Sequence, residues 1–462
     1  MRILAGLVLI LAFGVCAAAA WVLQGPIPPA DWFSSPAASF QLARGINPHP
    51  IQLVRPVPPA RFSLMAGLGR QIFLDASLSA SGRLSCASCH DPSNHYGPPT
   101  GGPVVYGGLG MHSPGVRAVP TLTYLDFQQN FHIGPDPAGD SDAALPPLPQ
   151  LAAAAKTVSR ATKTAQDTAQ SAANIVPAGG LFWDGRADTL QQQAMGPLTS
   201  IYEMDGGSPQ TIAARMRAAP YAGTMKQLFG DSIFSDPPLA VSEALFAVAR
   251  YQIENQDFHS FTSKYDYWLE GKARLTPAEM RGYILFNDPG KGDCAACHLD
   301  QPTPDHRPPL FTDTQYEALG IPRNPAIPAN KNPDYYDLGL CGPYRTDLES
   351  ETQYCGMFLT PTLRNAAGRG VFFHNGYYHD LHDAVEFYNL RDVLPGKIYP
   401  TGADGQVEMF NDLPKRYRNN IDHTDPPLNR KPGGRAALTT AEVDDIVAFL
   451  RTLTDGYKPA GD

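Results

Sequence analysis

The sequence has few cysteines and little positive charge for its length. Only 7 of its 462 residues are cysteine, so a cysteine motif that occurs more than once is not expected by chance. Lysine and arginine number 36 against 45 aspartate and glutamate residues, which gives a net charge of −9. This balance argues against nucleic acid or an anionic membrane surface as a partner. Proline (45) and glycine (42) are abundant instead, and they favour modest helices joined by long loops.

Four of the cysteines form a repeated pentapeptide, Cys86–His90 and Cys294–His298. In each copy two thiols lie one helical turn apart, where they can add to the vinyl groups of a haem, and the next residue is a histidine that can ligate the iron. We therefore expect two covalently bound haems c, attached to Cys86, Cys89, Cys294 and Cys297, with iron ligands His90 and His298. A four-thiolate zinc site is the alternative, but a long stretch of chain separates the pairs and each pair carries its own histidine.

The N-terminus has the pattern of an export signal. Arg2 precedes an apolar run from Ile3 to Leu23, and small residues at 18–20 fit a cleavage site. We interpret residues 1–23 as a signal peptide; the alternative is a retained inner-membrane anchor, because the run is long enough to span a bilayer. Cys16 lacks the small preceding residue that lipidation favours. In both cases the body of the protein is expected in the periplasm.

Two further cysteines, Cys341 and Cys355, remain once the haem motifs and the signal are set aside. An even pair in an oxidising compartment favours a disulfide that closes the loop between them. Two free buried thiols are the alternative.

Helical periodicity and capping signals divide the rest of the chain. Apolar spacing predicts helices over 64–74, 211–229 and 240–253. Thr276, Pro277 and Glu279 form a capping box that begins a helix ending at Phe286, and the same device at Thr439 begins the last helix, 438–453. Because a capped helix leads into the second haem motif and another closes the chain, we expect two related haem units.

The predicted boundaries follow from these signals. A Pro-rich linker covers 24–57, an N-terminal haem domain covers 58–257 and a C-terminal haem domain covers 258–462, with its last helix as a candidate to pack on the first domain. A low-complexity insertion covers about 135–180 and is not expected to form a site.

Motifs between and after the haem sites resemble those of the bacterial dihaem cytochrome c peroxidase and MauG superfamily. The resemblance covers roughly residues 60 to 455 apart from the insertion, and it is closest to the MbnH- and BthA-like branch. It is carried by the following segments and residues: Leu181–Ala187, Gln193, Pro197, Glu203, Met204, Cys341–Gly356, Pro361–Asn365, Phe373–Gly376 and Phe387–Asp392. The resemblance implies a mainly α-helical fold of two cytochrome c-like domains, each with one haem.

The resemblance also implies roles for individual residues. The first haem, on His90, would be the peroxidatic one and the second, on His298, the electron-transfer one. Trp183 corresponds to a tryptophan that relays electrons between the haems. Gln193, Pro197 and Glu203 correspond to the distal pocket of the first haem, where a carboxylate can take a proton from one peroxide oxygen and return it to the other while an amide positions the peroxide.

The chain departs from the family pattern at two places. Many relatives have a histidine that ligates the first iron until activation, and Tyr106 stands at its position, so we expect an open first haem; His112 is the alternative ligand. Relatives also bind Ca²⁺ between the haem domains through an asparagine and two backbone carbonyls, and these positions are Ala118, Arg369 and Val371 here. Because an oxygen ligand is lost, and the Arg369 guanidinium is an alternative occupant of the same space, calcium is left open.

The distal ligand of the second iron is predicted to be Tyr388. In the helical pattern 381–388 it lies on the same face as Leu381, Ala384 and Val385. It also stands at the family position that is methionine in peroxidases and tyrosine in MauG, and tyrosine is an established haem ligand. Met357, at ordinary cytochrome c spacing after His298, is the alternative.

The expected activity is H₂O₂-dependent oxidation, in which peroxide produces high-valent haem and Trp183 shares the oxidising equivalents with the second haem. The expected partner is a small cytochrome c or copper protein as electron donor, or a protein substrate whose side chains are oxidised. The rival hypothesis is a dihaem electron-transfer cytochrome without peroxide chemistry, which would contain two six-coordinate low-spin haems.

Overall fold

The computed structural model of the chain describes residues 36–99, 101–135 and 175–459. The predicted signal peptide or anchor, the start of the predicted linker and most of the predicted insertion lie outside these ranges. Within them, none of the helices combines the length and the apolar character that a membrane crossing requires.

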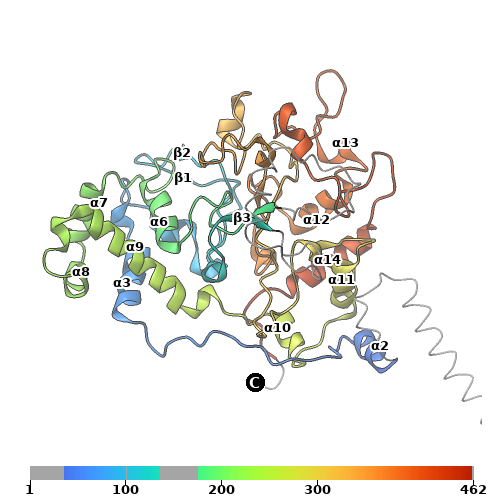
Figure 1. The fold of residues 1–462 in the computed structure, drawn as a ribbon, viewed down its shortest axis with the longest axis horizontal. Coiled ribbons are helices and arrows are strands. Elements are labelled where there is room, and N and C mark those ends of the chain that lie inside the picture. Colours follow the sequence, from blue (N-terminus) through green and yellow to red (C-terminus); the bar gives the residue numbers. More distant parts are fainter. Residues whose placement is uncertain (1–35, 100, 136–174, 460–462) are drawn as a thin grey trace, which may run out of the picture.

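The described chain is mainly helical, with helices gathered into an N-terminal and a C-terminal group (Figure 1). The first group contains α3 (Leu64–Phe73), α4 (Cys86–Cys89), α6 (Leu190–Thr199), α7 (Pro209–Ala218), α8 (Ala222–Phe229) and α9 (Pro237–Glu254). The second contains α10 (Lys264–Leu269), α11 (Pro277–Asn287), α12 (Leu381–Leu390), α13 (Pro395–Ile398) and α14 (Thr440–Arg451), with α2 (Pro36–Ala43) beside it.

Strands are short and pair only in antiparallel couples within the described residues. The pairs are β1 (Tyr106–Gly107) with β2 (Ser113–Pro114), β3 (His132–Pro135) with β4 (Ile175–Ala178), and β5 (Tyr316–Glu317) with β6 (Phe358–Leu359). In β3 and β4, His132 faces Ala178, so this ladder joins the two ends of the predicted insertion.

The core of the N-terminal group forms where α3 crosses α9. Ser63 caps α3 by accepting a hydrogen bond from the Ala66 N–H, and Leu68 and Ile72 are buried against the apolar face of α9. The crossing depends on Gly69, because a Cβ at that position would lie 1.8 Å from the Ala247 carbonyl oxygen. A side chain there would therefore force the two helices apart.

The C-terminal group repeats this arrangement with α11 and α14. The predicted capping boxes begin both helices, at Thr276 and Thr439, and are confirmed. A Cβ at Gly282 of α11 would lie 1.9 Å from the Asp445 carbonyl oxygen of α14, so a glycine again sets the distance between the helices. In both groups, the core forms where two helices cross at a glycine that allows close contact.

Two helical predictions differ from the structure in detail. The pattern over 211–229 is divided into α7 and α8, because Pro220 has no N–H to continue a helix and holds Ala219 in an extended conformation. The last helix packs on α11 and α12 of its own group. The contact with the N-terminal group is made by the segment after it, where Asp455 accepts a hydrogen bond of 2.5 Å from the Tyr124 hydroxyl.

The described part of the predicted linker, 36–57, packs on the C-terminal group before the chain reaches α3 (Figure 1). Leu42 and Leu53 are buried in the second core, and the Trp268 indole donates to the Gly45 carbonyl at 3.0 Å. Arg55 pairs with Glu270 at 2.6 Å. The segment therefore ties the beginning of the chain to its C-terminal half.

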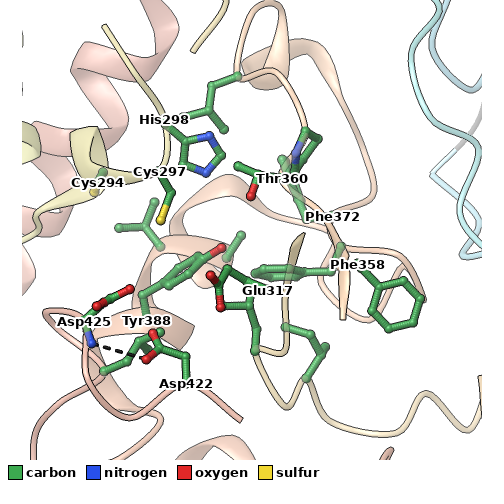
Figure 2. Close-up of a pocket in the computed structure, with 18 of the residues that line it drawn as sticks. Cys294, Cys297, His298, Glu317, Phe358, Thr360, Phe372, Tyr388, Asp422 and Asp425 are labelled. Atoms are coloured by element: carbon green, nitrogen blue, oxygen red, sulfur yellow. Dashed lines mark hydrogen bonds between the residues drawn. The ribbon is translucent and has the colours of Figure 1, made fainter. Parts of the chain in front are cut away.

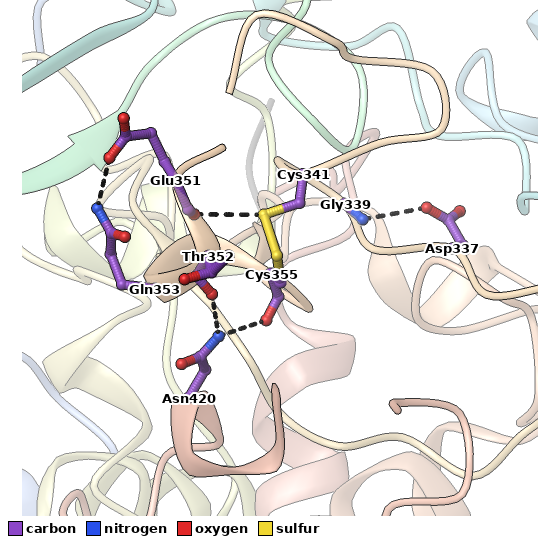
Figure 3. Close-up of a disulfide and its surroundings, with 8 residues drawn as sticks. All are labelled: Asp337, Gly339, Cys341, Glu351, Thr352, Gln353, Cys355 and Asn420. Atoms are coloured by element: carbon purple, nitrogen blue, oxygen red, sulfur yellow. Dashed lines mark hydrogen bonds between the residues drawn. A yellow bond between two sulfur atoms is a disulfide. The ribbon is translucent and has the colours of Figure 1, made fainter. Parts of the chain in front are cut away.

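The predicted disulfide between Cys341 and Cys355 is present (Figure 3). Asn420 supports the enclosed loop, since its side-chain N–H groups donate to the carbonyl oxygens of Thr352 and Cys355 at 2.8 and 3.0 Å. The Asp337 carboxylate accepts from the Gly339 N–H at 3.1 Å beside it. The prediction of an oxidised pair is confirmed.

Candidate haem sites

A cavity in the C-terminal group contains the second cysteine–histidine motif. Cys294, Cys297 and His298 follow α11 and line one side of it, and α12 lines another. Most of the remaining wall is apolar. Figure 2 shows the His298 ring, the Cys297 thiol and the Tyr388 ring pointing into the same space. Two adjacent thiols and a histidine in an apolar slot are the groups that a covalent haem requires.

Backbone carbonyls orient the His298 ring. Its Nδ1 atom lies 2.9 Å from the Phe311 carbonyl oxygen, and the Pro361 carbonyl is a second hydrogen-bond partner. Burial lowers the pKa of His298 to about 4, so the ring is neutral at neutral pH. A neutral ring that donates its Nδ1 proton to a carbonyl keeps the Nε2 lone pair for iron. The residues of this site therefore fit the group.

Tyr388 lies where the helical pattern predicted, on the cavity face of α12. Leu381, Ala384 and Val385 line the cavity with it. Burial raises the pKa of the Tyr388 hydroxyl, and the nearby Cys297 and Cys294 thiols add to the shift. Met357 is not part of this lining and packs instead against the buried cluster around the disulfide.

Acidic residues near Tyr388 were not predicted from the sequence. Glu317, Asp422 and Asp425 line the cavity beside it (Figure 2). They come from β5 and from a loop that follows Ile421, and no spacing or motif marks them in the sequence. Burial raises the pKa of Cys297, and Asp313 together with these three carboxylates reinforces the shift.

The first motif orients its histidine in the same way as the second, although it forms a short α-helix where the second forms a 3-10 turn. Cys86 and Cys89 begin and end α4, and Ser85 forms a capping box at its start. His90 Nδ1 lies 3.2 Å from the Tyr96 carbonyl oxygen, and the Pro120 carbonyl is a second partner, as Pro361 is for His298. Burial lowers the pKa of His90 to about 4. Burial also raises the pKa of the Cys86 and Cys89 thiols, to about 12 and 11. This site too fits a covalent haem.

The predicted distal residues lie on and after α6. Gln193 is buried on α6 and lines a second cavity, and Pro197 lies within the same helix. Glu203 follows the helix, where its backbone carbonyl accepts from the Gly108 N–H at 2.8 Å. Burial raises the pKa of the Glu203 carboxyl, against opposing contributions from Ser200 and Arg186. Its charge also contributes to the raised pKa of Cys89, so the carboxyl lies near the first motif.

Trp183 lies between the two cavities and lines both of them. It is 7% exposed, and its indole N–H donates to the Ala118 carbonyl oxygen at 2.8 Å. Its own carbonyl accepts from the Leu359 N–H at 2.9 Å, which joins it to the C-terminal group. Trp183 is thus held through its indole on one side and through its backbone carbonyl on the other.

The two departures from the family pattern are visible in the structure. Tyr106 is 48% exposed on β1, and His112 is exposed in the β1–β2 hairpin. Ala118 has no side-chain oxygen, and its carbonyl already accepts from Trp183. The chain therefore offers a hard cation fewer ligands here than an asparagine would.

Comparisons with known proteins agree with this geometry. A family model described as "Di-haem cytochrome c peroxidase" matches residues 64–274. Methylamine utilization protein MauG of Paracoccus denitrificans is 33% identical over 406 residues, covering 86% of this chain and 90% of that protein. Cytochrome c551 peroxidase of Nitrosomonas europaea is 27% identical, covering 88% of this chain and 84% of that protein. The crystal structure of the diheme peroxidase BthA from Burkholderia thailandensis matches with a TM-score of 0.71 and 33% identity, covering 89% of this chain and 94% of that one.

Proposed function

Since the chain belongs to the family of dihaem cytochrome c peroxidases and MauG proteins, we propose that its two haem sites have separate roles. The chain is a peroxidase-type oxidoreductase with two c-type haems, as the sequence predicted. Cys86, Cys89 and His90 hold the peroxidatic haem. Cys294, Cys297 and His298 hold the electron-transfer haem. These sites belong to the proposed domains 58–257 and 258–462.

Glu203 moves the proton at the peroxidatic site. When bound, the first haem supplies the iron at which the O–O bond of H₂O₂ is broken. Glu203 accepts the proton of the peroxide oxygen nearer the iron and donates it to the departing oxygen, which leaves as water. The half-buried position of Glu203 and its raised pKa support this role. The Gln193 amide orients the peroxide, and Pro197 shapes the pocket wall.

Trp183 and Tyr388 act on the electron-transfer side. Trp183 carries electrons between the haem sites, which is supported by its place between the two cavities. Tyr388 would hold the iron of the second haem together with His298, supported by its position on the cavity face of α12. The electrons come from a small cytochrome c, a copper protein or the side chains of a protein substrate. The disulfide and the covalent haems support a periplasmic location.

A single observation carries the proposal: one buried tryptophan lines both cavities, with Gln193 on one side and Tyr388 on the other. The test is stopped-flow absorption spectroscopy of the diferric protein mixed with H₂O₂. We expect a rapid change in the haem bands of the wild type. In Glu203→Gln the haem content should be unchanged and the reaction slower by at least about 10²-fold, the scale of a lost acid–base group.

Glu349→Gln is the matched control, because Glu349 is exposed and lies outside both cavities. It should react like the wild type. Two low-spin haems that do not respond to peroxide would overturn the proposal and favour a plain electron carrier. Unchanged kinetics in Glu203→Gln would overturn the distal-pocket assignment alone.

A further inference from the structure

Arg369 carries a guanidinium that is half-buried. It follows the turn Ala366–Gly368, and its guanidinium donates to the Val119 carbonyl oxygen at 2.9 Å. No ion pair joins it to a carboxylate of the described residues. Two fully buried arginines have such partners: Arg364 lies 2.7 Å from Asp266, and Arg391 lies 2.7 Å from Asp392.

The pKa values of Arg369 and Arg364 shift in opposite directions. Burial lowers the pKa of Arg369 to about 10, and no carboxylate opposes the effect. The pKa of Arg364 is instead raised, because the attraction of Asp266 exceeds the cost of burial. A guanidinium that is partly withdrawn from water without a counter-charge is stabilised by an anion that binds beside it.

The guanidinium lies near the first haem site, since Arg369 lines the same cavity as Pro120, whose carbonyl is a hydrogen-bond partner of His90. Arg369 lines the cavity that also contains Pro120, Trp183 and Gln193. Its charge contributes to the lowered pKa of His90, after the larger effect of burial. The positive charge therefore lies close to the group that the first motif attaches.

We propose that Arg369 binds a carboxylate of the haem held by Cys86, Cys89 and His90. The inference rests on the proposed function, which assigns a haem to that site. A haem brings two propionates, and the planar guanidinium forms paired hydrogen bonds with a carboxylate. Because Arg369 belongs to the C-terminal half while Val119 and the haem motif belong to the N-terminal half, the contact joins the halves through the cofactor.

The measurement is the midpoint potential of each haem, obtained by spectroelectrochemical titration without peroxide, with haem content as the check on folding. A positive charge beside a haem disfavours the ferric state, so its loss lowers the potential. We expect Arg369→Gln to lower the potential of the first haem and to shift its propionate bending band in resonance Raman spectra. The second haem should be unchanged. Arg369→Lys keeps the positive charge but loses the paired N–H groups of the guanidinium, and it should lower the potential of the first haem less than Arg369→Gln does.

Arg83→Gln is the matched control, since Arg83 carries the same charge three residues before Cys86 but is exposed. Solvent screens it, and the potential should not change. A free anion at Arg369 would make the wild-type potential depend on added formate, whereas a tethered propionate would not. Dependence on formate, or an Arg369→Gln potential equal to that of Arg83→Gln, would overturn the proposal. Neither outcome affects the peroxide test of Glu203.

Discussion

Tyr388 is a single residue whose identity sets the proposed chemistry of the second site. It reaches the cavity from α12 beside Cys297, and its hydroxyl shares the space with Glu317 (Figure 2). An anionic oxygen ligand stabilises the oxidised iron, whereas a thioether favours the reduced state. We therefore expect Tyr388→Met to raise the reduction potential of the second haem and to reduce the share of oxidising equivalents stored there after peroxide treatment.

Met357→Leu is the control for that measurement, because Met357 packs against the disulfide cluster and not in the cavity lining. It should leave both potentials unchanged in redox titrations. A shift in Met357→Leu with none in Tyr388→Phe would show that the thioether is the ligand.

At the scale of residues, the sequence gives specific predictions where chemistry imposes spacing. The thiols and histidines of the motifs, and Tyr388 on a helix face, are fixed by local geometry. Arg369 and the carboxylates Glu317 and Asp422 have no such pattern. They reach their sites through loops that long-range packing positions, so a single sequence does not reveal them.

At the scale of elements, the capping boxes are the strongest local signals. Thr276 caps α11 by accepting from the Glu279 N–H, and the Glu279 carboxylate accepts in return from the Thr276 N–H at 2.7 Å. We expect Thr276→Ala to lower the free energy of unfolding by about 1 kcal/mol, because a buried helix loses its cap. Thermal or denaturant unfolding of the haem-loaded protein measures this.

Thr276→Ser keeps the hydroxyl and is the matched control, with stability close to that of the wild type. Equal losses in both variants would mean that the threonine methyl group, and not the cap, stabilises the helix. These elements also show which helix ends can be predicted. The starts of α11 and α14 are marked by capping-box residues in the sequence, whereas the break between α7 and α8 depends on a single proline.

At the scale of the whole molecule, the two halves are joined by contacts far apart in the sequence. Leu53 lies in the C-terminal core, and Tyr124 binds Asp455 near the other end of the chain. These contacts connect elements that no local pattern relates, so the sequence indicated two haem units without indicating how they meet. The contact between the halves bears on function because Trp183 lies at it.

Trp183 tests whether the halves work as one redox unit. Its indole is held by Ala118 from one half, and its carbonyl by Leu359 from the other. We expect Trp183→Phe to keep both ferric haem spectra, since phenylalanine retains an aromatic ring in the same space, but to impair charge sharing. After one equivalent of peroxide, Mössbauer spectra should show fewer oxidising equivalents at the second haem. Trp268→Phe is the matched control, because Trp268 is also buried but lies outside both cavities. Wild-type sharing in Trp183→Phe would show that electrons pass between the haems by another route.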